Sequence, residues 1–169
     1  MNPQSAPFLS AVILGLIAWT AVSRRYIWPH IRQLPLPSAA EPILYLHLFR
    51  FIGLAFIAPG VVDASLDPRW AGPAAYGDVF AGLLAGLALL LRSGPLFKPA
   101  LWAFNLWGIF DLLRAAALGP VYAVPPKLHA TFFIPTLGVP LLLCTHGMVF
   151  ALLIRELRTA ARLREGAPS

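Results

Sequence analysis

The sequence predicts an all-α, polytopic membrane protein, a transmembrane helical bundle of about five spans. Of its 169 residues, 59% are hydrophobic and only 12% are charged, whereas soluble domains usually carry about 25% charged residues. The mean hydropathy is +0.74. The apolar residues also come in runs of about 20, the length that crosses ~30 Å of hydrocarbon as a helix. These three observations exclude an ordinary soluble domain.

Segments rich in proline and glycine separate the apolar runs and delimit the helices. The predicted spans form a single membrane domain and cover residues 8–23, 43–62, 74–92, 97–118 and 133–154. Proline is tolerated in the first turn of a helix, and Pro42, Pro73 and Pro99 suit that position. Residues 23–42 are then a long connection along one membrane face. Residues 155–169 are a basic tail that continues the fifth helix.

Lys and Arg are distributed unevenly over the connections, which predicts an orientation. Nine of them lie in the first connection, the third connection and the C-terminal tail: Arg24, Arg25, Arg32, Arg92, Lys98, Arg155, Arg158, Arg162 and Arg164. Only Arg69 and Lys127 lie in the other two connections. Because cytoplasmic loops are enriched in positive charge, the N-terminus is predicted to be external and the C-terminus cytoplasmic. The net charge of +6 then indicates anionic lipid headgroups rather than nucleic acid as the partner.

Polar side chains inside the predicted spans are the candidate site residues, because such groups normally face the bundle and have partners. They are His47, Arg50, Asp78, Asn105, Asp111, Arg114 and His146. Depths estimated at 1.5 Å per residue place Asp78, Asp111 and Arg114 in the external half and the other four in the cytoplasmic half. Asp78 and Arg114 have opposite charges at similar depth, which predicts that they pair. The group is either a set of helix clamps or a binding or relay site.

Two further patterns suggest specific contacts. His47 and His146 lie on different helices at similar depth, the arrangement needed to hold a haem iron by two imidazoles. Gly82 and Gly86 form a GxxxG pattern, which predicts a close-packed seam, either within the chain or with a second copy. The single cysteine, Cys144, suggests neither a disulfide nor a metal site.

Residues 43–154 resemble a group of small, uncharacterised, bacterial polytopic integral membrane proteins. The residues that carry the resemblance are Arg50 and Gly53 of "LFRFIG", Gly77 and Asp78 of "GDVFAG", Asn105, Gly108 and Asp111 of "NLWGIFDLLRA", and His146 at the end of the proline-bearing fifth span. The resemblance implies a multi-pass protein of the bacterial inner membrane. It implies no activity.

Three functions are compatible with these observations, and no catalytic residue is indicated because the glycine-loop, zinc-protease and nucleophile-elbow signatures are missing from the sequence. The first is a non-catalytic accessory or structural subunit of a larger membrane assembly. The second is a small-molecule or proton-coupled transporter that uses the intramembrane Asp, Arg and His residues. The third is a b-type haem protein with His47 and His146 as ligands.

Overall fold

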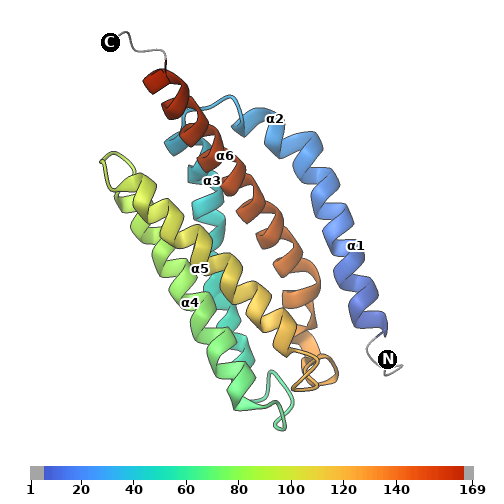
Figure 1. The fold of residues 1–169 in the computed structure, drawn as a ribbon. Coiled ribbons are helices and arrows are strands. Elements are labelled where there is room, and N and C mark those ends of the chain that lie inside the picture. The colour runs from blue at the N-terminus through green and yellow to red at the C-terminus, as the bar shows by residue number, and fades with distance from the viewer. Residues whose placement is uncertain (1–5, 166–169) are drawn as a thin grey trace.

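Five helical segments lie side by side and form the predicted all-α bundle (Figure 1). The computed structural model describes residues 6–165, and the side chains of residues 6–163. No strand occurs within this part of the chain. The segments cover Ala6–Ile31, Leu36–Ile57, Pro68–Leu90, Phe97–Leu118 and His129–Leu163, and each is long and apolar enough to cross a membrane.

Three of the segments combine regular α-helix with tighter or wider turns. The first contains α1 (Ala6–Val22), the π-helix η2 (Ser23–Ile27) and α2 (Trp28–Ile31). The second contains α3 (Leu36–Leu48) and the 3₁₀-helix η3 (Phe49–Ile57), and the third and fourth are α4 (Pro68–Leu90) and α5 (Phe97–Leu118). After the short η4 (Pro125–Lys127), the fifth contains η5 (His129–Phe132), the π-helix η6 (Ile134–Gly138) and α6 (Val139–Glu165).

The second and third helices begin earlier than the sequence predicted. Pro42 and Pro73, expected in the first turns, lie inside α3 and α4. Asp67 begins α4 as its N-cap by accepting a bond from the backbone N–H of Arg69, and Pro68 occupies the first helical position. The pKa of Asp67 is lowered to about 2, mainly because the Arg69 side chain also donates to it. The cap therefore stays ionised at neutral pH.

The long connection expected over residues 23–42 was also wrong. The first helix continues through η2 and α2 to Ile31, and α3 starts at Leu36, so only a short turn joins them. A π-helix closes its hydrogen bonds one residue farther along the chain than an α-helix, so η2 continues the helix without breaking it. The expected continuation of the fifth helix is confirmed as far as Glu165.

The 3₁₀ geometry of η3 determines which of its side chains are buried. Its buried residues are Arg50, Gly53 and Phe56, which recur every third position. A 3₁₀-helix has 3.0 residues per turn, so these three residues lie in one line. In an α-helix each step of three residues turns 300°, and Phe56 would rotate about 120° away from Arg50. The 3₁₀ stretch thus keeps one continuous face of η3 against the bundle.

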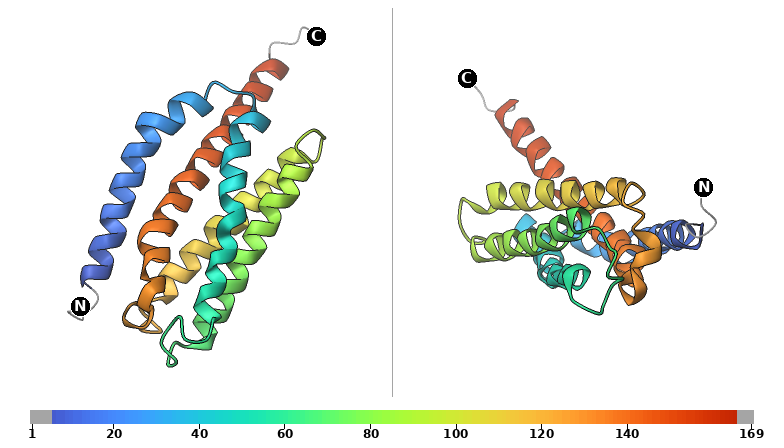
Figure 2. Two further views of the ribbon diagram at one scale, coloured as in Figure 1. Left: turned by 180° about the vertical axis from the view of Figure 1, so that it is seen from behind. Right: turned by 90° about the horizontal axis from the view of Figure 1, so that it is seen from below.

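α1 lies at the edge of the bundle and is separated from α4 and α5 (Figure 2). None of its residues is buried, and it packs on α6 and η6. Trp19 donates its indole N–H to the carbonyl of Leu137 (3.1 Å). Gly15 packs against the carbonyl of Thr136 and the ring of Pro140. Because Pro140 has no N–H, the usual i→i−4 bond to this carbonyl is missing where α1 approaches.

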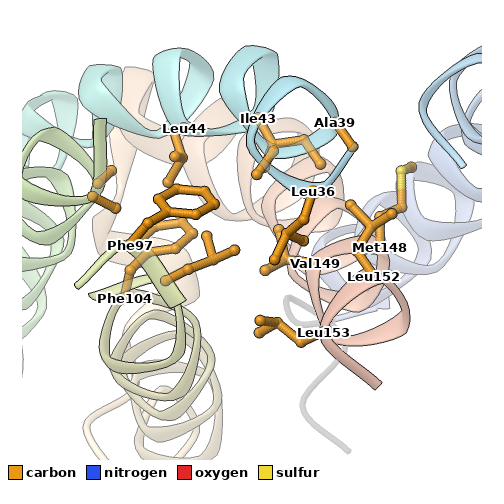
Figure 3. Packing of buried hydrophobic residues seen from close by; sticks show 14 of the residues in the cluster. Leu36, Ala39, Ile43, Leu44, Phe97, Phe104, Met148, Val149, Leu152 and Leu153 are labelled. Carbon is orange, nitrogen blue, oxygen red and sulfur yellow. The ribbon is translucent and has the colours of Figure 1, made fainter. Parts of the chain in front are cut away.

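Two apolar cores lie toward opposite ends of the bundle. The larger core joins α3, α4, α5 and α6, and Figure 3 shows Leu44 close to Phe97 and Phe104, with Val149, Leu152 and Leu153 on the neighbouring α6. The smaller core lies near the loops that precede α4 and follow α5, and it includes Phe56, Trp70 and Leu128. The candidate site lies between these two cores.

Candidate functional site

Arg50 is the centre of a buried polar cluster. Its Nε donates to Oδ1 of Asp78 on α4, and its Nη2 donates to Oδ2 of Asp111 on α5, both at 2.7 Å. The Arg50 side chain is only 1% exposed. Its planar guanidinium carries five N–H donors, so it can serve two carboxylates at once. One side chain of η3 therefore binds two neighbouring helices.

The remaining edge of the guanidinium faces α6. Nη1 of Arg50 lies 3.4 Å from Nε2 of His146 and 3.4 Å from the carbonyl of Gly108. Nδ1 of His146 lies 2.8 Å from Oδ1 of Asn105. Because a carboxamide oxygen can only accept, Nδ1 carries the proton, and Nε2 is free to accept from Arg50. The hydrogen-bond network thus assigns a neutral His146 and the orientation of the Asn105 amide.

His47 extends the cluster on the other side of His146, and the centroids of the two rings are 4.5 Å apart. Nε2 of His47 lies 2.9 Å from the hydroxyl of Thr145. The same hydroxyl lies 2.9 Å from the carbonyl of Leu142. In the described chain, Nδ1 of His47 and Nδ2 of Asn105 are buried and lack hydrogen-bond partners. Two buried nitrogens of this layer therefore have unused hydrogen-bonding capacity.

Three glycines make room for the polar side chains. Each glycine lies against a polar side chain of the next helical segment, with which a Cβ would overlap: Gly53 with Asp78, Gly77 with Asp111, and Gly108 with His146. We call these contacts the glycine notches. In each notch, a polar residue of one helix packs against the bare backbone of the helix before it. Only glycine allows this approach, because every other residue has a Cβ.

The glycine notches also enclose the carboxylate oxygens that Arg50 does not bind. Oδ2 of Asp78 lies against Gly53, and Oδ1 of Asp111 lies against Gly77. Among the residues that the structure describes, no group of three or more acidic, His or Cys side chains is arranged to hold a metal ion. The backbone of Gly53 and of Gly77 therefore covers one side of each free oxygen.

The predicted pair of Asp78 and Arg114 was wrong, because Asp78 pairs with Arg50. Arg114 is half-buried and forms no ion pair within the described chain. The early start of α3 explains the error. The midpoint of Leu36–Ile57 lies before His47, whereas the midpoint of the predicted span lies beyond Arg50. Arg50 therefore lies on the external side of the midpoint, where it meets the aspartates, so the two predicted polar layers form one cluster.

The histidine geometry does not fit a haem held between His47 and His146. Axial imidazoles lie on opposite faces of a flat macrocycle, but these two rings contact each other directly. Both histidines are fully buried, with 0% exposure. Three of their four ring nitrogens face Thr145, Asn105 and Arg50.

The GxxxG pattern of α4 is used within the chain. A Cβ at Gly82 would lie 3.4 Å from the carbonyl of His47, and one at Gly86 would lie 3.5 Å from the side chain of Leu48. Gly82 is buried, so α4 approaches the junction of α3 and η3 closely. The predicted close-packed seam is thus formed within the chain. Self-association of two copies through Gly82 and Gly86 stays a prediction.

A family model described as "Domain of unknown function (DUF8737)" matches residues 7–154. The chain belongs to this family. The match reaches all five helical segments, ends within α6, and includes every residue of the polar cluster. No curated protein and no solved structure matches the chain.

Two contributors to the site were missed by sequence reasoning. Thr145 is not among the candidate site residues of the sequence, yet its hydroxyl lies 2.9 Å from Nε2 of His47. Trp107 donates its indole N–H to the carbonyl of Gly77 (3.2 Å), which holds α5 beside the notch that receives Asp111. The signal available for Trp107 was its position four residues before Asp111, because residues four apart share a helix face.

Proposed function

We propose that this protein is a small proton-coupled carrier of the bacterial inner membrane, in which Asp78 and Asp111 share one exchangeable proton around Arg50. The observation that carries the proposal is the two-to-one ratio of carboxylates to the guanidinium they contact. A purely structural clamp needs one partner of each sign, because an uncompensated charge inside a bilayer is costly. Sharing one proton makes the three contacting groups neutral.

The surroundings favour a proton over a larger cation as the ligand. The carboxylate oxygens that Arg50 leaves free are covered by Gly53 and Gly77. Arg114 lies one turn from Asp111 but is not in ion-pair contact with either aspartate. The remaining titratable neighbours are His146, which accepts from Arg50, and His47 behind it.

A route for the proton beyond Arg50 is supported by the unused groups of the same cluster. His146, Asn105 and His47 continue the polar line from the aspartates toward Thr145. Nδ1 of His47 and the amide nitrogen of Asn105 are buried without hydrogen-bond partners, so both can take part in a relay. Chains of Asp, His and similar groups are the usual proton relays of membrane proteins. Because five spans are few for alternating access and lack an evident inverted repeat, we propose that the carrier acts as an oligomer.

Proton movement tests this function. Purified protein is reconstituted into liposomes that contain a trapped pH-sensitive dye, and a potassium diffusion potential drives protons inward. We expect the wild type to acidify the lumen faster than protein-free liposomes, and Asp111→Asn to abolish this excess. The control is Asp63→Asn, which makes the same chemical change at a carboxylate in the loop before α4.

Infrared spectroscopy on the same samples tests the shared proton itself. The wild type should show the C=O stretch of a protonated carboxyl group, and the band should weaken in Asp111→Asn but not in Asp63→Asn. Equal proton flux in Asp111→Asn and the wild type would contradict the carrier. A protonated-carboxyl band without any proton flux would mean that the proton is bound but does not move. That result would favour the accessory subunit described next.

The second candidate is a non-catalytic accessory subunit of a larger membrane assembly, and the position of α1 favours it. Within the described chain α1 has no buried residue and packs mainly on the last helical segment and its own continuation, so most of its surface is open to another polypeptide. Size-exclusion chromatography of natively expressed protein in mild detergent tests this candidate. Co-elution with other polypeptides would support it, whereas a small particle of this chain alone would contradict it.

A further inference from the structure

A groove runs along the C-terminal part of α6, with an apolar beginning and a basic end. Its volume is about 410 Å³, and it is lined by Ala151, Ile154, Arg155, Arg158, Thr159 and Arg162. These positions recur three and four residues apart, so they share one face of the helix. Figure 1 shows that this end of α6 projects past the neighbouring helices.

Arg155 is held in place at the middle of the groove. Its Nη2 donates to the carbonyl of Leu34 (3.1 Å), and its Nη1 donates to the carbonyl of Arg32. Both carbonyls belong to the turn between α2 and α3. The guanidinium therefore has a fixed position, and binding a ligand there costs little side-chain entropy.

Arg158 and Arg162 extend the positive charge along the same face, and both are exposed. The carboxylates of Glu41 and Glu156 at this end of the bundle are engaged elsewhere, with Arg92 and with Lys98 (3.0 Å) respectively. They do not neutralise the groove. Guanidinium groups bind phosphate oxygens through paired N–H donors, so the groove has the chemistry of a phosphate site.

The order of residues along the groove indicates which phosphate compound fits. Ala151 and Ile154 lie on the bundle side, next to the apolar span, and the arginines lie toward the helix end. A phospholipid has the same order, with acyl chains toward the bilayer and phosphate at its surface. We infer that this groove is a specific binding site for the phosphate headgroup of an anionic phospholipid.

Native mass spectrometry tests the site on the full chain, purified in mild detergent with equal amounts of phosphatidylglycerol and phosphatidylcholine. We expect the wild type to retain phosphatidylglycerol preferentially. Arg158→Gln/Arg162→Gln should lower that preference at least about tenfold, because each arginine near an anionic surface contributes about 1 kcal/mol. Both side chains are exposed, so the double variant should fold normally.

The matched control is Arg24→Gln/Arg25→Gln, which removes the same charge from η2, where both side chains are also exposed. It should change the lipid preference less than about twofold. An equal loss in both double variants would overturn the site and leave only general attraction to anionic headgroups. Displacement of the lipid by excess inorganic phosphate would show that the groove takes the free anion, which would also overturn the lipid site.

Discussion

Arg50 makes two ionic contacts. If its two aspartates share one proton, replacing Arg50 should destabilise the fold more than replacing Asp111. In Arg50→Gln, Asp78 and Asp111 lose the only cation in contact with them. We expect a loss of about 3 kcal/mol, typical of a buried pair that loses one partner, and a melting midpoint lower by roughly 6–12 °C. In Asp111→Asn a neutral Arg50–Asp78 pair survives, so the loss should stay below about 1 kcal/mol, or roughly 2–4 °C. Tryptophan fluorescence during heating in detergent measures both.

The double variant Asp78→Asn/Asp111→Asn provides the control for this series. It leaves Arg50 buried without a negative partner, so its melting midpoint should fall about as far as that of Arg50→Gln. If the single variant Asp111→Asn lost as much stability as Arg50→Gln, both carboxylates would have to be ionised in the native protein. That result would contradict the shared proton.

Substitutions in the glycine notches should lower stability through steric overlap rather than through loss of charge. In Gly108→Ala the new Cβ overlaps the imidazole of His146 and would lie 3.0 Å from Nη1 of Arg50. Overpacking of this kind costs about 1–3 kcal/mol, which should appear as a lower melting midpoint. The matched control is Gly147→Ala in α6, where a Cβ would meet no atom within 4 Å. Because alanine favours helix over glycine by about 1 kcal/mol, this control should melt at the same or a higher temperature.

At the scale of elements, η3 shows why helical periodicity alone could not identify the buried face. An α-helical pattern expects buried residues three and four apart in alternation, whereas η3 buries every third residue through Arg50, Gly53 and Phe56. This spacing is visible in the sequence. The spacing predicts a 3₁₀-helix only if the three residues are known to be buried on one face. That knowledge requires the positions of α4 and α5, which the sequence does not give.

The packing of α1 on α6 predicts a specific cross-link. The hydroxyl of Thr20 lies 3.6 Å from the sulfur of Cys144. Thr20→Cys should therefore form a disulfide with Cys144 when membranes are treated with a mild oxidant, which peptide mass spectrometry detects. Ala18→Cys is the control, because two residues turn about 200° around the helix and place the thiol on the other face. Cross-linking of both variants, or of neither, would contradict the observed position of α1.

At the scale of the whole molecule, the charge distribution predicts an external N-terminus and a cytoplasmic C-terminus. Ser65 and Ser93 are exposed in the loops at opposite ends of α4. In a Cys144→Ala background, Ser65→Cys should react with a membrane-impermeant maleimide in intact cells. Ser93→Cys should react only after permeabilisation. The reverse pattern would mean the opposite orientation.

Hydropathy was sufficient to predict five helices, because each apolar run must be helical to satisfy its backbone in a bilayer. The partners of Arg50 could not be predicted in the same way. Placing the start of the second helix at residue 43 instead of Leu36, and its end too late, shifted the estimated depth of Arg50 by about 9 Å. The sequence does contain a signal for the true start of α4. Asp67 is a typical N-cap residue, and Pro68 after it suits the first helical position. The members of the site were predicted, but their pairing depended on helix ends.

The glycine notches join only helices that are consecutive in the chain, and this arrangement has a consequence for biosynthesis. A membrane protein is made from its N-terminus, so Arg50 enters the translocation channel before Asp78 or Asp111 has been synthesised. An arginine at the centre of an isolated helix opposes insertion by about 2.5–3.5 kcal/mol. We therefore expect the second helix to remain near the ribosome-bound channel until α4 emerges and Asp78 reaches its notch at Gly53. Each later helix then docks on the one already in place, so the polar cluster sets the order in which the bundle assembles.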